Sequence, residues 1–466
     1  MDYRWRVLLI VLGVLLVVGV FHQVKPLPDG LSLRGEEVFV SESDVSILID
    51  DTFMLGEEQV FSHEIFDEVF SLIAGSEEFV HVDMFLFNDY PPGEYHRSLT
   101  DELTASLLSS AASHRSLVTD PINTVYGGAG HEQLSLLEDG GVDVVVSDLS
   151  GLRDSNVFYS PLYRVFFSWV GNQRGGFLPS VLSEERVSLR SYLRLLNFKA
   201  NHRKVVVADS GGELVSVVSS ANPHDASSAH SNVAARIRSS AFAQQVVFSE
   251  RPLVPSLPSP PSLGESSGGE VSAQLVTEGA IKEVVLEELG SVEAGDVVEL
   301  GMFYLSDRDV IEALVGASLR GASVRVVLDP AKDAFGREKS GVPNRQAAWD
   351  LVRLSGGAVE LRWFATQGEQ FHSKFLAVTR VDGSSVLVLG SANYTRRNLD
   401  DYNLESNVVL RSSSDAAFVL TLREYFSSVW SNEGGLRTVD YSVYADESRW
   451  RYVLYRFQEA TGLSTF

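Results

Sequence analysis

Residues 369–393 read E-Q-F-H-S-K-F-L-A-V-T-R-V-D-G-S-S-V-L-V-L-G-S-A-N, and the architecture expected for the whole chain follows from them. His372 and Lys374 stand two residues apart at the head of an apolar run, so in an extended strand both point to the same side. Residues 386–389 predict a second strand, which ends in the turn Gly390-Ser391-Ala392-Asn393. An imidazole, an ammonium and an amide brought together in this way suit an anionic phosphorus centre.

A second copy of this pattern lies upstream. It reads N-H-R-K-V-V-V-A-D over residues 201–209 and V-V-S-S-A-N over residues 217–222, so that His202 and Lys204 match His372 and Lys374. From lysine to asparagine there are 18 residues in the first copy and 19 in the second, and the two histidines are 170 residues apart. Matched internal spacing indicates a duplication that can place both histidines at one pseudo-twofold interface.

Paired H-x-K-x4-D motifs, each followed by a G-S-x-N-like turn, resemble the phospholipase D superfamily, and the resemblance runs from about Val40 to the C-terminus. The flanking stretches D-P-A-K-D-A-F-G-R-E-K (329–339) and R-W-F-A-T-Q-G-E-Q-F-H (362–372) are similar to bacterial membrane-anchored phospholipase D or cardiolipin synthase-like members. The resemblance implies two tandem phospholipase D-like α/β sandwich domains related by a pseudo-twofold. No metal or other cofactor is expected, because a cation beside the imidazole makes His-x-Lys a poor metal pair.

The resemblance also implies the roles of the motif residues. One histidine attacks phosphorus to form a phosphohistidine, and the other protonates the leaving alcohol before acting as a base. By analogy, His202 is preferred as the nucleophile. The non-bridging oxygens would be held by the motif lysines and the turn residues, namely Lys204, Lys374, Asn222, Asn393, Ser220 and Ser391.

Two positions break the symmetry of the motifs. Glu405 is expected to orient an imidazole and to raise its pKa, whereas aligning E-S-N-V-V-L with H-S-N-V-A-A puts His230 at that place in the first half. Thr379 replaces the aspartate that the first motif keeps as Asp209. Seven residues separate Asp209 from His202, so we interpret this aspartate as a structural anchor. Asp83, in an apolar strand, is either a hydrogen-bonded structural carboxylate or a pocket residue.

Both halves alternate strands and helices. In the second half the pattern predicts a helix over 280–289, a strand over 297–305, a helix over 309–320 and a strand over 323–328. In the first half it predicts a helix over 62–73 and a strand over 79–88, and we match the later helix–strand pair with 132–138 and 142–146. We therefore expect α/β domains over 38–251 and 271–466, joined by a flexible Pro/Ser/Gly linker over 252–270.

Residues 1–24 predict an N-terminal membrane anchor. Fifteen apolar residues, Val7 to Phe21, follow Arg4 and Arg6, and with their flanks they cover about 27 Å as a helix. A cleaved signal peptide is the alternative, although F-H-Q-V-K-P is a poor cleavage context. The two arginines favour the cytoplasmic side, which places the catalytic part on the extracytoplasmic side.

Composition constrains the partners. The 466 residues carry a net charge of −24 and no cysteine, so a thiolate site is excluded and an acidic surface counts against nucleic acid. A phospholipid substrate within a bilayer is the expected partner, and the oligomeric state stays open. Residues 152–196 form an aromatic insertion that either contacts lipid or forms a core helix. The loop 329–345, with Lys332, Arg337, Lys339 and Arg345, either borders a head-group pocket or is solvated.

The sequence therefore predicts a membrane-anchored phosphodiesterase or phosphatidyltransferase that acts on glycerophospholipids. Two alternatives remain at this point. A metal-independent nuclease would apply the same chemistry to another diester, and a non-catalytic lipid-binding protein would follow if Thr379 marked a decayed site.

Overall fold

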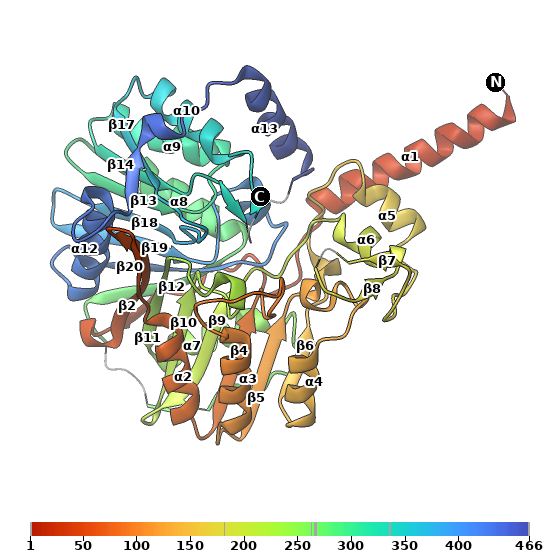
Figure 1. Cartoon of the computed structure of the whole chain (residues 1–466), viewed down its shortest axis with the longest axis horizontal. Helices are drawn as coiled ribbons and strands as arrows, with labels where there is room; N and C mark the ends of the chain where they lie inside the picture. The colour runs from red at the N-terminus through yellow and green to blue at the C-terminus, as the bar shows by residue number, and fades with distance from the viewer. Residues whose placement is uncertain (1, 181, 262, 265–267, 335–336, 465–466) are drawn as a thin grey trace.

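The computed structural model describes residues 2–180, 182–261, 263–264, 268–334 and 337–464. Parts of the predicted linker (262 and 265–267) lie outside these ranges. Two large sheets organise the molecule, with helices on their outer faces (Figure 1). The α/β class predicted from the sequence is confirmed.

The first sheet has eight strands in the order β3-β2-β11-β10-β9-β4-β5-β6. Its strands are β2 (Val45–Leu55), β3 (Glu58–Ser62), β4 (Phe79–Met84), β5 (His114–Thr119), β6 (Asp143–Val146), β9 (Lys204–Ser210), β10 (Glu213–Ser219) and β11 (Asn232–Arg238). The helices α2 (Ile65–Gly75), α3 (Leu99–Ser109) and α4 (Glu132–Asp139) cover its outer face.

The second sheet has nine strands in the order β1-β12-β20-β19-β18-β13-β14-β17-β21. Its strands are β1 (Val38–Val40), β12 (Val271–Thr277), β13 (Val297–Met302), β14 (Ser323–Leu328), β17 (Val359–Phe364), β18 (Lys374–Thr379), β19 (Ser384–Gly390), β20 (Ser406–Ser413) and β21 (Thr438–Asp440). The helices α8 (Gly279–Gly290), α9 (Arg308–Leu319) and α10 (Asn344–Leu354) cover it. Although β1 lies in the first half of the sequence, it pairs with β12 and so belongs to the second sheet.

The duplication is visible in the strand order. The run β2-β11-β10-β9-β4-β5-β6 in one sheet corresponds to β12-β20-β19-β18-β13-β14-β17 in the other. The counterpart of α9 and β14 is therefore the pair α3 and β5. Our sequence match of residues 309–328 with residues 132–146 is wrong by one helix–strand unit, because α4 and β6 correspond to α10 and β17.

The inner faces of the two sheets share one hydrophobic core. Val205 and Val207 of β9 pack in the same cluster as Phe375 of β18 and Leu389 of β19. Strands buried on both faces are apolar almost throughout, which explains the runs V-V-V-A and F-L-A-V after the two lysines. The helices α7 (Ser240–Glu250) and α12 (Ala417–Ser431) complete this core.

The start of the predicted linker belongs to this core as well. Val254 and Leu257 are buried among the inter-sheet residues. The expectation of a flexible tether is therefore wrong for these residues, which form a packed crossover between the halves.

Two further parts lie outside the sandwich. Helix α1 (Tyr3–Val24) projects from the body, and the insertion with α5 (Ser160–Phe166), β7 (Leu178–Pro179), β8 (Arg186–Val187) and α6 (Leu189–Leu195) lies at its base (Figure 1). By length and composition, α1 is long and apolar enough to cross a membrane. The remaining elements are β15 (Asp333–Ala334), β16 (Arg337–Glu338), α11 (Arg396–Leu399) and α13 (Arg449–Thr461).

Candidate active site

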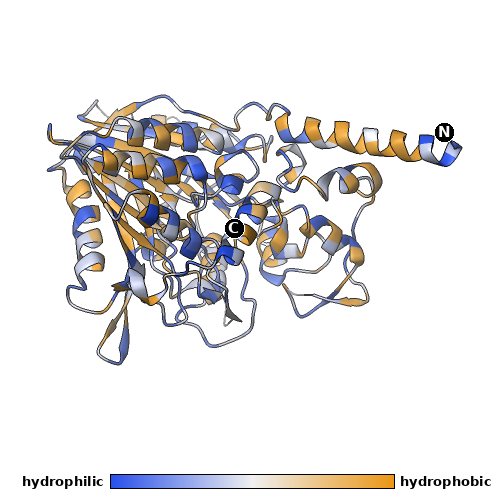
Figure 2. Ribbon diagram, turned by 90° about the horizontal axis from the view of Figure 1, so that it is seen from above, coloured by the Kyte–Doolittle hydropathy of each residue, from blue (hydrophilic) through white to orange (hydrophobic). Residues whose placement is uncertain are grey.

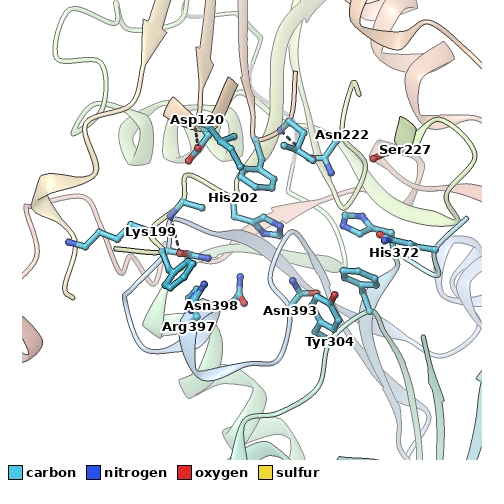
Figure 3. Close-up of a pocket in the computed structure, with 18 of the residues that line it drawn as sticks. Asp120, Lys199, His202, Asn222, Ser227, Tyr304, His372, Asn393, Arg397 and Asn398 are labelled. Atoms are coloured by element: carbon cyan, nitrogen blue, oxygen red, sulfur yellow. Dashed lines mark hydrogen bonds between the residues drawn. The ribbon is translucent and has the colours of Figure 1, made fainter. Parts of the chain in front are cut away.

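Both motif histidines face one cavity between the two halves. The cavity has a volume of about 280 Å³, and His202, His372, Asn222 and Asn393 line it (Figure 3). Each histidine stands two residues before the first residue of a central strand, β9 for His202 and β18 for His372, so the starts of these two strands place both imidazoles at one cavity. The structure thus brings together the two sets that the sequence spacing paired.

The two motifs have matching local geometry. The ammonium of Lys204 donates to the carbonyl of His202 at 2.7 Å, and that of Lys374 donates to the carbonyl of His372 at 2.6 Å. Each lysine also lies 5.1 Å from the centre of a phenylalanine ring, Phe85 in the first half and the equivalent residue of the second half. That equivalent is Phe303, and each phenylalanine packs against the histidine of its own motif. Sequence reasoning missed this aromatic pair.

Two buried aspartates fix the backbone before each histidine. Asp120 accepts the N–H of Asn201 at 2.6 Å, and Asp329 accepts the N–H of Phe371 at 2.9 Å. Burial raises the pKa of both carboxyls to about 7. Each aspartate follows a strand and precedes a proline, so the repeated dipeptide Asp-Pro was a signal that the sequence analysis did not use.

Each imidazole is oriented by the opposite half of the chain. The Nδ1–H of His202 donates to Glu405 at 2.9 Å, and the Nδ1–H of His372 donates to the amide oxygen of Asn232 at 3.1 Å. The partner of His202 is thus an anion and that of His372 is neutral. Because Nδ1 of each ring is taken by its partner, Nε2 is the nitrogen left for chemistry.

The residue equivalent to Glu405 is Asn232, and the sequence alignment that chose His230 is wrong by two positions. The bridge between Asn201 and Leu404 corresponds to that between Phe371 and Ser231, so that residue 405 matches residue 232. The inserted turn before β20 is longer than the turn before β11, and this difference hides the match. His230 instead lies with its ring 5.9 Å from that of His372.

Burial, rather than Glu405, dominates the protonation of the site. It lowers the pKa of His202 to about 4 although Glu405 acts in the opposite direction, and with Lys374 it holds the pKa of His372 well below its usual value. It also lowers the pKa of Lys204 to about 7 and that of Lys374 well below its ordinary value. The expectation that Glu405 keeps an imidazole protonated near neutral pH is therefore wrong, because the effect of burial on the pKa of His202 is larger.

The turn residues divide into two groups. Asn222 and Asn393 line the cavity, and the side-chain oxygen of Asn393 is buried without a hydrogen-bond partner among the described residues. Ser220 and Ser391 do not line it. Their hydroxyls donate to Asn232 and Glu405 respectively, so they hold the orienting groups rather than a phosphate oxygen.

Asp209 anchors a strand end, as the sequence spacing suggested. Its carboxylate accepts the backbone N–H groups of residues 77, 78 and 79 at 3.0, 3.0 and 2.7 Å, where β4 begins. In the second half the equivalent junction joins the end of β18 to the start of β13, and here the carboxylate comes from the β13 side. Asp296, just before β13, accepts the N–H of Val381 at 2.9 Å, beyond the end of β18. A carboxylate is therefore kept at this junction although Thr379 replaces the motif aspartate.

Asp83 lies outside the cavity. It is fully buried and accepts two hydrogen bonds from the amide of Asn201. Next to it, the buried Arg203 forms ion pairs with Glu250 at 2.9 Å and with Glu278 at 2.7 Å. The structural interpretation of Asp83 is the one that the structure supports.

Further polar residues line the cavity that the motifs did not indicate. Lys339 comes from the loop 329–345 and contacts the hydroxyl of Tyr304, while Lys199, Arg397 and Asn398 lie on the other side (Figure 3). Of the four basic residues predicted in the loop, Lys339 lines the cavity, and the side chain of Arg337 lies outside the described part.

Comparisons with known proteins agree with this geometry. Residues 288–430 match the sequence family described as cardiolipin synthase, PLD-like domain. The crystal structure of phosphatidylserine synthase from Haemophilus influenzae Rd KW20 superposes with a TM-score of 0.55 and 10% identity over 92% of this chain and 97% of that one, so the two share a fold. No curated protein sequence matched.

Two other structures are more distant. Polyphosphate kinase from Porphyromonas gingivalis gives a TM-score of 0.48 at 12% identity, over 89% of this chain and 52% of that one. Nuc, a phospholipase D family member from Salmonella typhimurium, gives 0.29 at 20% identity, over 37% of this chain and 99% of that one.

Proposed function

Because the chain is a member of the phospholipase D superfamily, we propose that it is a membrane-anchored phosphodiesterase or phosphatidyltransferase that acts on glycerophospholipids. One observation carries the proposal. Two imidazoles from different halves face one cavity, and each has its Nδ1 fixed by a group from the opposite half. This arrangement suits in-line displacement at phosphorus by one ring with proton transfer by the other.

In the proposed reaction His202 is the nucleophile. Its Nε2 attacks phosphorus while the bond to the head-group oxygen breaks, and Nε2–H of His372 gives its proton to that oxygen. The phosphorylated ring is a cation for as long as the intermediate lasts, and Glu405 lies against its Nδ1. His372, next to the neutral Asn232, then takes a proton from water or an acceptor alcohol, whose oxygen displaces Nε2 of His202.

The remaining cavity groups stabilise charge on the phosphoryl oxygens. Burial makes the ammonium groups of Lys204 and Lys374 costly to charge, so a bound diester, which is negative, would favour their protonated form. The amides of Asn222 and Asn393 line the same cavity and can donate to the oxygens without a change in charge.

The charge and the N-terminal helix favour a lipid over a nucleic acid. A net charge of −24 offers little counterion release to a polyanion. Helix α1 instead supplies proximity to a bilayer, and we propose that it is an uncleaved anchor with the catalytic part on the extracytoplasmic side.

The test uses the full-length protein in proteoliposomes that contain labelled phosphatidylglycerol. We expect release of glycerol with phosphatidic acid when water is the acceptor, with cardiolipin when a second phosphatidylglycerol is the acceptor, or with another phosphatidyl ester when an alcohol is added. We expect His202→Ala to abolish these products. A matched control is His114→Ala, because His114 begins β5 and does not line the cavity. Absence of every lipid product would refute the proposal, and cleavage of single-stranded DNA in EDTA would replace it with a nuclease.

A second experiment assigns the two imidazoles. A phosphodiester with a nitrophenol leaving group needs no acid, so His372→Ala should release nitrophenol in one burst per molecule and retain the phosphoryl group on His202. The same substrate given to His202→Ala should give no burst. The reverse pattern would make His372 the nucleophile.

A further inference from the structure

The insertion differs in charge from the rest of the molecule. Residues 152–199, which are the insertion and the three residues after it, contain seven basic and three acidic residues, which gives a net charge of +4 and leaves −28 for the remainder of the chain. The basic residues are Arg153, Arg164, Arg174, Arg186, Arg190, Arg194 and Lys199. Lys199 is buried, whereas Arg174, Arg186 and Arg190 are exposed, and exposed cations on an acidic protein indicate a negatively charged partner for this part.

The same insertion exposes large apolar side chains. Trp169 is 77% exposed, Phe177 70%, Phe158 60% and Leu189 53%. Several large exposed apolar side chains within one short insertion indicate an interaction site. The expectation of an ordinary core helix is wrong here, since Ser160 and Pro161 are the buried residues of α5.

The position of the insertion beside α1 favours a bilayer as the partner of these side chains. Gly19 is the buried residue of α1, and a Cβ there would lie 2.8 Å from the ring of Pro161 in α5. Gly19 stands two residues before Phe21, where the apolar run ends, so α5 packs within about 3 Å of that end along the helix axis. A bilayer crossed by α1 would therefore have its surface at the level of α5. Figure 2 shows the apolar helix running past the insertion.

Three neighbouring cavities lie between the insertion and the imidazoles, and each shares lining residues with the next. A second cavity of about 240 Å³ shares Tyr126 and Lys199 with the catalytic one. A third, of about 470 Å³, lies within the insertion, is lined by Phe177 and shares Tyr163 and Arg194 with the second. The three cavities therefore lie one after another between the insertion and the imidazoles.

We propose that residues 152–199 form a docking element that inserts Phe158 and Trp169 into the surface of an anionic bilayer beside the end of α1. Aromatic side chains suit the interfacial region and the arginines suit anionic head groups. Lipid then enters the catalytic cavity from this face, along the row of cavities. The docking itself does not depend on the reaction, whereas the entry route rests on the proposed function.

The chain has no cysteine, which allows single labels without background. A cysteine at position 158 or 169 of the full-length protein carries an environment-sensitive fluorophore in vesicles of phosphatidylcholine with phosphatidylglycerol. We expect higher emission, and quenching by lipids with a nitroxide near the head group. Matched controls are labels at positions 319 and 381, since Leu319 is 67% and Val381 73% exposed on the second half.

Equal quenching at all four positions would overturn the proposal. The proposal would also be overturned if the labels at positions 158 and 169 were shielded without lipid by a second copy of the protein. This face would then be an interface between copies. If the emission in vesicles of pure phosphatidylcholine equals that in vesicles with phosphatidylglycerol, the proposed binding of anionic head groups by the arginines would be contradicted.

The entry route has a separate readout. Phe158→Ser combined with Trp169→Ser should lower turnover of vesicle lipid about tenfold relative to turnover of a soluble nitrophenyl diester. An unchanged ratio would contradict the route. If the soluble diester is not cleaved by the unsubstituted protein, the proposed function fails instead, and the fluorescence result still stands.

Discussion

The imidazoles of His202 and His372 differ most in the group that orients each ring. Glu405 is an anion against His202, and Asn232 is neutral against His372. In the proposed reaction a neutral imidazole is the nucleophile and a protonated one is the acid, so the charge of each partner influences the pH at which the pair is active. Both rings have pKa values below the ordinary 6.5 because they are buried.

The first prediction concerns pH. The acid must be protonated, and its pKa lies below 6.5, so we expect kcat/KM to have its maximum on the acid side of pH 6.5 and to fall as the pH rises. Asn232→Asp should raise the pKa of His372 and move the falling limb to higher pH. Glu405→Gln removes the group that raises the pKa of His202, so it should move the acid limb to lower pH and reduce the rate roughly a hundredfold or more.

The measurement is the pH profile of kcat/KM for the soluble diester. His114→Ala serves as the control and should leave both limbs in place. A maximum above pH 7.5, or limbs that do not move in either variant, would contradict the assignment of partners.

The second prediction concerns the two anchoring carboxylates. Asp209→Ala leaves the N–H groups at the start of β4 without their acceptor, and Asp296→Ala does the same to Val381. We expect each variant to lose about 2 kcal/mol of unfolding free energy and to keep its activity per folded molecule. Urea unfolding followed by circular dichroism measures the loss. A large fall in kcat without loss of stability in Asp209→Ala would assign it a chemical role.

At this scale the sequence identified the histidines, lysines and asparagines but not their connections. Repetition of a motif can be counted along a chain, whereas the two-residue difference in turn length before β11 and β20 cannot be seen without the strands. For the same reason Asp120 was missed: its hydrogen bond reaches Asn201, 81 residues further on.

Strand β19 and the turn after it form the element on which the second motif depends. Gly390 has a φ of +153°, and a Cβ there would lie 2.3 Å from the carbonyl oxygen of Ser406 on β20. The side-chain oxygen of Asn407 also accepts the N–H of Ala392, so β20 positions the turn that carries Asn393.

The third prediction follows from that contact. Gly390→Ala should push β19 away from β20, cost about 2 kcal/mol of stability and lower kcat at least about tenfold by displacing Asn393. Gly290→Ala is the matched control, because Gly290 ends α8 and a Cβ there meets nothing within 4 Å. Unfolding midpoints and kcat are measured for both. Unchanged kcat in Gly390→Ala would show that the turn does not depend on this contact.

Elements with strong periodicity were predicted well. Strand β14 has the predicted bounds, and α9 differs from its predicted range by one residue at each end. Helix α3 and strand β5 were missed, and the matching of the halves failed for that reason. Residues 99–109 contain threonine, serine and two acids beside their leucines, so the apolar face of α3 is a weak signal in one sequence.

For the whole molecule, the arginines that precede the apolar run of α1 predict on which side of the membrane the two sheets lie. Arg4 and Arg6 favour the cytoplasmic side, so the two sheets should lie on the other side of the membrane. A single cysteine at Val381 should react with a membrane-impermeant maleimide in intact bacterial cells that express the full chain. A cysteine at Tyr3 should react only after permeabilisation. Labelling of Tyr3→Cys alone in intact cells would reverse the orientation.

The fold class and its duplication were predictable for the whole chain, but the sharing of parts between the halves was not. Strand β1 crosses to the second sheet, and the residues Val254 and Leu257 are buried in the core between the sheets. Proline and serine are frequent in this segment, so its composition predicts a linker. The segment packs because its two apolar side chains are buried between the sheets.

The reciprocal hold of the imidazoles has a consequence for any attempt to divide the chain. Each half carries one of the two histidines and the group that orients the histidine of the other half, but not the group that orients its own. Two copies of the second half, if they met in the same way, would set a glutamate against both rings, and two copies of the first half would set an amide against both. Only a pair made of one first half and one second half sets a glutamate against one ring and an amide against the other. If the chain is cut between residues 258 and 268 and the two fragments are co-expressed, activity should therefore require both fragments. The activity should rise with the product of the two fragment concentrations.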